Sequence, residues 1–127
     1  MGNKGRTSKK RIYRHFRSYL YALRGITRLF KTEFNFWVHI SIAICTIMLG
    51  FIFDLSSLEW VAVVLCCGLV LSAEAINTAI EYLANYCTTE KNEQIRKVKD
   101  VAAGAVLFCA ITAFVVGLII FIPKLFY

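Results

Sequence analysis

Three long apolar runs constrain what this chain can fold into. They cover residues 36–53, 58–83 and 101–122, and the first contains only three polar residues. A helix that crosses a bilayer needs about 20 mostly apolar residues, and each run meets this length, the first only just. Because lipid offers the backbone no hydrogen-bond partners, such runs cross a membrane as helices. The sequence therefore predicts an all-α integral membrane protein with three transmembrane helices.

Composition and the placement of charge agree with a membrane protein. Hydrophobic residues make up 58% of the 127-residue chain, which has room for a single domain over residues 1–127. Ten of the fifteen Lys and Arg residues lie before residue 32, and four more lie in the polar connection at 86–100. By the positive-inside rule, both basic regions are cytoplasmic, whereas the turn at 54–57 and the C-terminus lie outside. The bases would also attract nucleic acid, but nucleic-acid binding leaves the apolar runs unexplained, so we expect no nucleic-acid partner.

The residues before the first run predict a helix that lies on the cytoplasmic membrane surface. A basic tail at 1–9 leads into residues 10–31, where apolar side chains recur every three or four positions and bases occupy the remaining surface. This pattern is typical of an amphipathic helix with its apolar side in lipid and its bases near lipid phosphates. A plain topogenic anchor explains most of these bases equally well, and both interpretations stay open. The apolar positions are Ile12, Phe16, Tyr19, Leu23, Ile26 and Phe30.

A polar stripe interrupts the second apolar run. Glu74, Asn77 and Glu81 have the spacing i, i+3, i+7, which places all three on one face of a helix. Charged groups at membrane depth are costly and usually mark a functional site. A patch that only holds helices together is the alternative. Two acids on one face favour function, because like charges repel unless a cation lies between them.

Further charged residues lie near the same side of the membrane. Glu33 precedes the first run, and Lys99-Asp100 precedes the third. Glu33 and Glu81 are candidate ligands for Mg²⁺, which accepts one or two carboxylates and completes its shell with water and substrate phosphates. At the lipid–water boundary a soluble nucleotide such as ATP can meet a lipid alcohol, and phosphoryl transfer between them needs positioning, a metal and a proton acceptor. Glu74, about 10 Å deeper than Glu81, is the candidate general base.

Other residues suggest less. The five cysteines lack metal-ligand spacing and are interpreted as packing residues. His39 is expected to be a buried, hydrogen-bonded side chain and not a metal ligand. No glycine-rich nucleotide loop of the form G-x-x-x-x-G-K-[ST] is present, so side chains would have to hold a nucleotide. Pro123 and the lysine after it are expected to end the third helix.

Two motifs resemble those of the prokaryotic diacylglycerol kinase and undecaprenol kinase family. They are residues 74–81 (EAINTAIE) and, after a polar loop, residues 99–106 (KDVAAGAV), and the spacing to Gly25 and Glu33 also agrees. The similarity runs from about residue 14 to residue 120. It implies a small membrane kinase that transfers phosphate from ATP to a lipid alcohol with magnesium. It also implies a homotrimer whose active sites are shared between subunits.

The resemblance also implies roles for single positions. Glu33 and Glu81 would bind the metal, and Glu74 would be the general base. Asn85 departs from the family pattern, which usually has Asp there, so a charge is lost while a hydrogen-bonding oxygen remains. Arg14 and Tyr21 match more weakly. The residues expected to line the nucleotide and phosphate site are Arg14, Tyr21, Glu33, Asn77, Glu81, Asn85, Lys99 and Asp100.

Two other function classes stay open beside the kinase. One is a small cation- or proton-coupled transporter, and the other is an inactive scaffold of the same fold. Acids near one membrane face, beside a basic loop, favour kinase chemistry over conduction. Undecaprenol and diacylglycerol are both open as substrates, with a slight preference for undecaprenol from the resemblance. The expected location is the bacterial inner membrane, multi-pass, with the N-terminus cytoplasmic.

Overall fold

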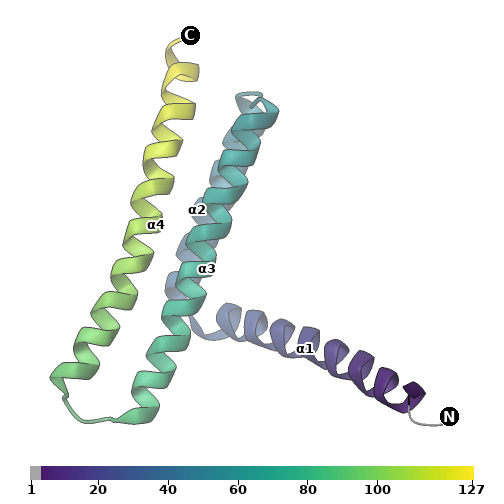
Figure 1. Ribbon diagram of the computed structural model, residues 1–127. Coiled ribbons are helices and arrows are strands. Elements are labelled where there is room, and N and C mark those ends of the chain that lie inside the picture. Colours follow the sequence, from purple (N-terminus) through teal and green to yellow (C-terminus); the bar gives the residue numbers. More distant parts are fainter. Residues whose placement is uncertain (1–3) are drawn as a thin grey trace. The chain divides into compact units, whose positions relative to one another are not determined.

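The described residues fold into four helices, which confirms the all-α prediction. The computed structural model describes residues 4–127, with side chains from Thr7 onward. The helices are α1 (Lys4–Thr32), α2 (Phe34–Ile52), α3 (Ser57–Cys87) and α4 (Glu93–Phe126), as Figure 1 shows. Residues 1–3 of the expected basic tail lie outside the described residues, whereas 4–9 form the first turns of α1.

The chain divides into two compact units, residues 1–33 and residues 34–127. The first unit is α1, whose described side chains are almost all exposed. Arg17 Nη2 donates a 2.8 Å hydrogen bond to the hydroxyl of Tyr21, and the guanidinium of Arg24 lies 5.8 Å from the centre of the same ring. Residues 10–31 lie within the helix α1, and the place of this helix on a membrane surface stays a prediction.

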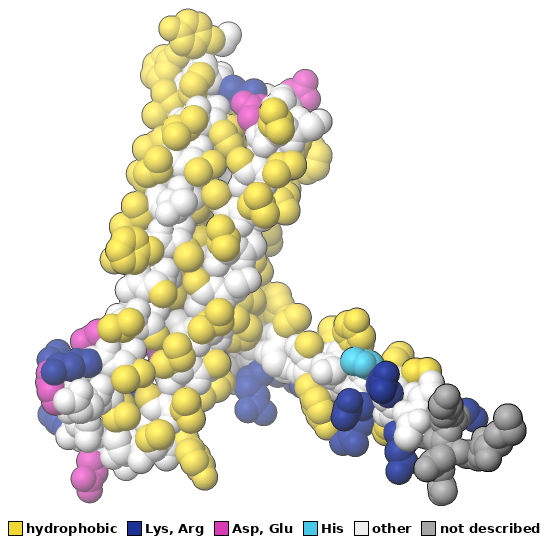
Figure 2. Space-filling view, in the orientation of Figure 1, with side chains coloured by type: hydrophobic (Ala, Val, Ile, Leu, Met, Phe, Trp, Pro, Cys, Tyr) yellow, Lys and Arg dark blue, Asp and Glu magenta, His cyan; other side chains and the backbone are white. Residues whose placement is uncertain are grey.

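The second unit contains α2, α3 and α4, each long and apolar enough to cross a membrane. Large apolar side chains cover the outside of these helices, which suits a surface in contact with lipid. On the face drawn in Figure 2, the charged side chains of this unit gather mainly at its two ends. The prediction of three transmembrane helices therefore agrees with the structure.

A tight turn joins α2 to α3. Asp54 has φ 50°, a left-handed conformation that Asp tolerates better than most residues. The Ser56 hydroxyl then accepts from the backbone N–H of Glu59, while the Glu59 carboxylate accepts from the Ser56 N–H at 2.7 Å, which forms a capping box. Lys124 Nζ lies 3.2 Å from the Glu59 carboxylate, so the end of α4 is held beside the start of α3.

The core lies near this turn. Leu55, Val63 and Ile120 are buried together, with Trp60 packed against them. A Cβ added at Gly50 would lie 2.7 Å from the Trp60 ring, so glycine is needed where α2 approaches this indole. α3, which carries the polar stripe, packs most extensively against α4.

Two sequence expectations about helix ends were wrong. The polar connection expected at 86–100 is only residues 88–92, because Asn92 caps α4 early by accepting from the N–H groups of Gln94 and Ile95. The expectation missed this because it counted only apolar residues as helix. Pro123 does not end α4, which continues to Phe126. Proline lacks an N–H donor and its ring crowds the carbonyl four residues earlier, but Pro123 lies in the last turn of α4, and Tyr127 N–H still bonds to the Pro123 carbonyl at 3.0 Å.

Candidate functional site

The polar stripe of α3 is largely buried. Glu74, Asn77 and Thr78 have exposed fractions of only 3%, 5% and 2%, although the surrounding helix is apolar enough to cross a membrane. Glu81 is half-buried at the next turn. Because α3 is one continuous helix from residue 57 to residue 87, the predicted stripe is confirmed as one face. Burying a carboxylate and an amide costs free energy, which indicates a use for them.

A hydrogen bond connects two members of the stripe. Asn77 Nδ2 donates to Glu81 Oε1 at 3.3 Å. The other end of the Asn77 amide, Oδ1, is buried and has no hydrogen-bond partner among the described residues. Most buried polar atoms in proteins do have a partner, so a buried acceptor of this kind suits a ligand that the protein binds.

His39 of α2 lies beside Glu74. Its Nε2 is 3.7 Å from Glu74 Oε2, within reach of an ion pair when the imidazole is protonated. The side chains of His39 and Glu74 are 19% and 4% exposed. The sequence predicted a buried, hydrogen-bonded His39. It did not predict the contact with Glu74, because the way α2 packs against α3 decides which residue of α2 meets the stripe.

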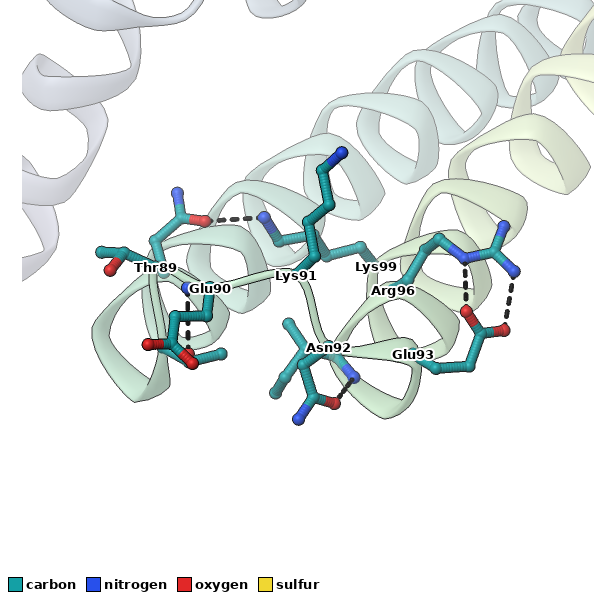
Figure 3. A pocket seen from close by; sticks show the side chains of 10 residues that line it. Thr89, Glu90, Lys91, Asn92, Glu93, Arg96 and Lys99 are labelled. Carbon is teal, nitrogen blue, oxygen red and sulfur yellow. Dashed lines mark hydrogen bonds and ion pairs between the residues drawn. The ribbon is translucent and has the colours of Figure 1, made fainter.

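A polar pocket of about 860 Å³ lies where α3 and α4 join, at the stripe's end of the helices (Figure 3). Three bases line it, namely Lys91, Arg96 and Lys99. Lys99 Nζ on α4 donates a 2.6 Å hydrogen bond to Asn85 Oδ1 on α3, which Figure 3 shows as a bridge across the pocket. Asn85 follows Glu81 by one helical turn, so the pocket adjoins the stripe.

The charge of Arg96 is already compensated. Its Nη2 and Nε donate to the Glu93 carboxylate at 2.7 and 3.1 Å, and its Nη1 lies 3.8 Å from Asp100 Oδ2. Lys99, by contrast, contacts a neutral amide, and no carboxylate among the described residues forms an ion pair with its ammonium. The structure therefore places the predicted residues Asn85 and Lys99 together, whereas Asp100 pairs with Arg96.

An apolar groove of about 410 Å³ lies on the face of the same unit where α2, α3 and α4 meet. His39 is the lining residue of α2 closest to the polar stripe. Farther along the groove, mostly small or apolar residues from all three helices form the wall, among them Ala43, Val70 and Gly117. The groove therefore begins beside the buried carboxylate and runs along the helices.

Three predicted site residues belong to the other unit, and their approach to the α3 stripe stays a prediction. Arg14 and Tyr21 are exposed on α1, where Tyr21 accepts from Arg17. Glu33 follows α1, and its carboxylate accepts a 3.0 Å hydrogen bond from the Thr32 hydroxyl. Among the described residues, no three His, Cys, Asp or Glu side chains gather in a cluster that could hold a metal.

A buried carboxylate, a buried amide oxygen without a partner among the described residues and a pocket lined by three bases lie in one unit of helices that are apolar enough to cross a membrane. This combination is typical of an enzyme embedded in a membrane. Residues 20–121 match the family model described as prokaryotic diacylglycerol kinase, and the chain belongs to this family. It is therefore a lipid kinase, which confirms the resemblance to the family and the enzyme class.

Two curated relatives support the assignment. The chain is 38% identical over 117 residues to the undecaprenol kinase of Bacillus subtilis, and the aligned region covers 92% of this chain and 95% of the relative. It is 32% identical over 109 residues to a diacylglycerol kinase of Synechocystis sp., and this aligned region covers 85% of this chain and 62% of the longer relative.

Proposed function

We propose that this protein uses ATP to phosphorylate a membrane lipid alcohol, and that the alcohol is undecaprenol rather than diacylglycerol. The observation that carries the proposal is the buried stripe of Glu74 and Asn77 beside a pocket with an available lysine. The choice of undecaprenol is supported by the near full-length similarity to the Bacillus subtilis undecaprenol kinase.

In the proposed reaction Glu74 is the general base. Its carboxylate takes the proton of the lipid hydroxyl while the hydroxyl oxygen forms a bond to the γ-phosphorus of ATP. The bond from the γ-phosphorus to the bridging β–γ oxygen breaks, and ADP leaves with that oxygen. Lys99 offers its ammonium to the phosphate oxygens in the polar pocket. Asn77, bonded to Glu81, keeps the second carboxylate oriented toward the same site.

Magnesium fits this donor set. The buried Asn77 Oδ1 without a protein partner and the neighbouring Glu81 carboxylate are both oxygen donors, the kind that Mg²⁺ prefers. Glu33 is the second carboxylate we expect to reach the ion. When bound, Mg²⁺ would offset the negative charge of the ATP phosphates. The small number of protein ligands is acceptable, because Mg²⁺ usually keeps several waters and substrate oxygens.

We also propose an orientation in the membrane and an oligomeric state for the protein. The basic residues near α1 and the 88–92 loop favour a cytoplasmic N-terminus and a cytoplasmic site in the inner membrane. A homotrimer with shared sites would bring Arg14, Tyr21 and Glu33 to the stripe, either from the same chain or from a neighbouring subunit. Both statements follow from charge placement and family resemblance.

The apolar groove is the proposed place for the tail of the lipid alcohol. It begins at His39, next to the general base, and runs along the helices as lipid chains run in a bilayer. A single groove suits an alcohol with one chain, as undecaprenol has. Because the tail moves from lipid into an equally apolar groove, the groove would contribute orientation more than affinity.

A phosphate-transfer assay tests the proposal. Purified protein in mixed micelles would receive ATP labelled at the γ-phosphate, magnesium and either undecaprenol or diacylglycerol. We expect label in the undecaprenol product and much less in the diacylglycerol product. Faster labelling of diacylglycerol would contradict the substrate choice. Labelling of neither lipid by well-folded protein would support the inactive scaffold instead.

A further inference from the structure

His39 and Glu74 form a contact between two transmembrane helices that sequence reasoning did not anticipate. His39 Nε2 on α2 lies 3.7 Å from Glu74 Oε2 on α3. The carboxylate is almost completely buried, whereas the imidazole also lines the apolar groove. The histidine thus stands between the buried carboxylate and the start of the groove.

A carboxylate in this position needs compensation. Burying a charge in an apolar medium is so costly that an uncompensated carboxyl group takes up a proton instead. A protonated carboxyl group cannot accept the proton of a hydroxyl, so it cannot act as a general base. An imidazole supplies what is needed, since its N–H, neutral or charged, can face the carboxylate oxygen.

Two polar side chains of the same site form hydrogen bonds with residues other than His39 and Glu74. The Asn77 amide N–H is bonded to Glu81, one turn along the stripe. Lys99 lies farther toward the 88–92 loop and bonds to Asn85. His39 faces the Glu74 carboxylate from α2.

We propose that His39 is a positioning residue for Glu74, which keeps the carboxylate charged and turned toward the lipid hydroxyl. The inference rests on the proposed role of Glu74 as general base. His39 acts through Glu74 and does not itself take the proton of the substrate. His39 lies at the start of the groove, where the hydroxyl of a lipid bound in the groove would lie close to Glu74.

Two substitutions at position 39 test the proposal. His39→Leu fills similar space without an N–H group, and His39→Gln restores an N–H donor without a ring. Misplacing a reacting group by about 1 Å can reduce a rate by about 100-fold. We expect His39→Leu to lower kcat with lipid alcohol by about that factor while the KM for ATP changes less than about twofold. We expect the kcat of His39→Gln to be at least about tenfold higher than the kcat of His39→Leu.

Ser41→Ala is the matched control. Ser41 lies on the same helix as His39 but outside the groove, and its hydroxyl donates to the Trp37 carbonyl of its own helix at 2.8 Å. Its kcat should stay within about twofold of the wild type. Thermal unfolding in detergent would show whether each variant is folded, and the folded glutamine variant keeps the test decisive if the leucine variant is unstable.

A double-mutant cycle separates this inference from the proposed function. If His39 acts through Glu74, His39→Leu should cost nothing further in a Glu74→Gln background, since residues that act as a unit are not additive. If His39→Leu lowered kcat in the Glu74→Gln background by the same factor as in the wild type, the positioning role would be overturned. Wild-type kcat in His39→Leu, or no recovery in folded His39→Gln, would overturn it too. Full activity of Glu74→Gln alone would instead refute the proposed base.

Discussion

Replacing Lys99 by methionine should weaken ATP binding with little effect on the fold. The Lys99 ammonium has three N–H groups, and one of them donates to Asn85 Oδ1 at 2.6 Å. Since this partner is neutral, two N–H groups and the full positive charge are left for phosphate oxygens in the pocket. Methionine keeps the length of the side chain and removes both the charge and the donors.

The size of the effect follows from the strength of such contacts. A hydrogen bond to a charged group contributes about 1.5–3 kcal/mol, and each 1.4 kcal/mol corresponds to a factor of ten in affinity. The Lys99→Met variant should therefore bind ATP between about ten and about 100 times more weakly. The lower end is expected, because most residues that line the pocket are exposed and salt screens exposed charges.

The assay is a titration of ATP in the mixed-micelle reaction, together with direct binding of a non-hydrolysable ATP analogue at two salt concentrations. The wild type should lose more affinity at high salt than the variant does. Lys97→Met is the control, since Lys97 lies on the same helix but does not line the pocket. An ATP affinity within twofold of the wild type in Lys99→Met, or an equal loss in the control, would refute the assignment of Lys99.

Three further substitutions test other parts of the structure. Asn85→Asp places a carboxylate on an exposed position beside the half-buried Lys99, so stability should change by less than about 1 kcal/mol. The KM for ATP should rise by up to about fivefold, and an unchanged KM would remove this position from the site. Gly50→Ala should lower the free energy of unfolding by about 1–3 kcal/mol relative to Gly117→Ala in detergent titrations. A Cβ at position 50 would lie against the Trp60 ring, whereas a Cβ at position 117 would meet no atom within 4 Å, so equal stabilities would contradict this packing. Ser56→Ala should cost about 1 kcal/mol in the same measurement, and no loss would show that the capping box is unimportant for α3.

Much of the fold could be predicted from the sequence because it depends on local patterns. Apolar runs of membrane length became α2, α3 and α4, and the spacing of Glu74, Asn77 and Glu81 became one helix face. The ends of the helices were less predictable. Asn92 starts α4 inside a polar segment, where hydropathy gives no signal and only a capping side chain marks the boundary.

Contacts between helices could not be predicted in the same way. Nothing near His39 in the sequence indicates that it faces Glu74, because the contact depends on the rotation and packing of α2 against α3. The bond from Lys99 to Asn85 has the same origin, since the two residues are 14 positions apart. Asn85 could be identified as a site residue only through the resemblance to the family, whereas Lys99 is also a charged residue before the third apolar run. The roles of Arg14, Tyr21 and Glu33 stay predictions.

The most direct test of the catalytic proposal is the turnover of Glu74→Gln. Glutamine preserves the shape of the side chain but cannot accept the proton of a lipid hydroxyl. In the mixed-micelle assay with saturating ATP, magnesium and undecaprenol, we predict that kcat falls by at least about 100-fold while ATP still binds. Turnover equal to that of the wild type would contradict the account, since the buried stripe of α3 would then have no part in the chemistry.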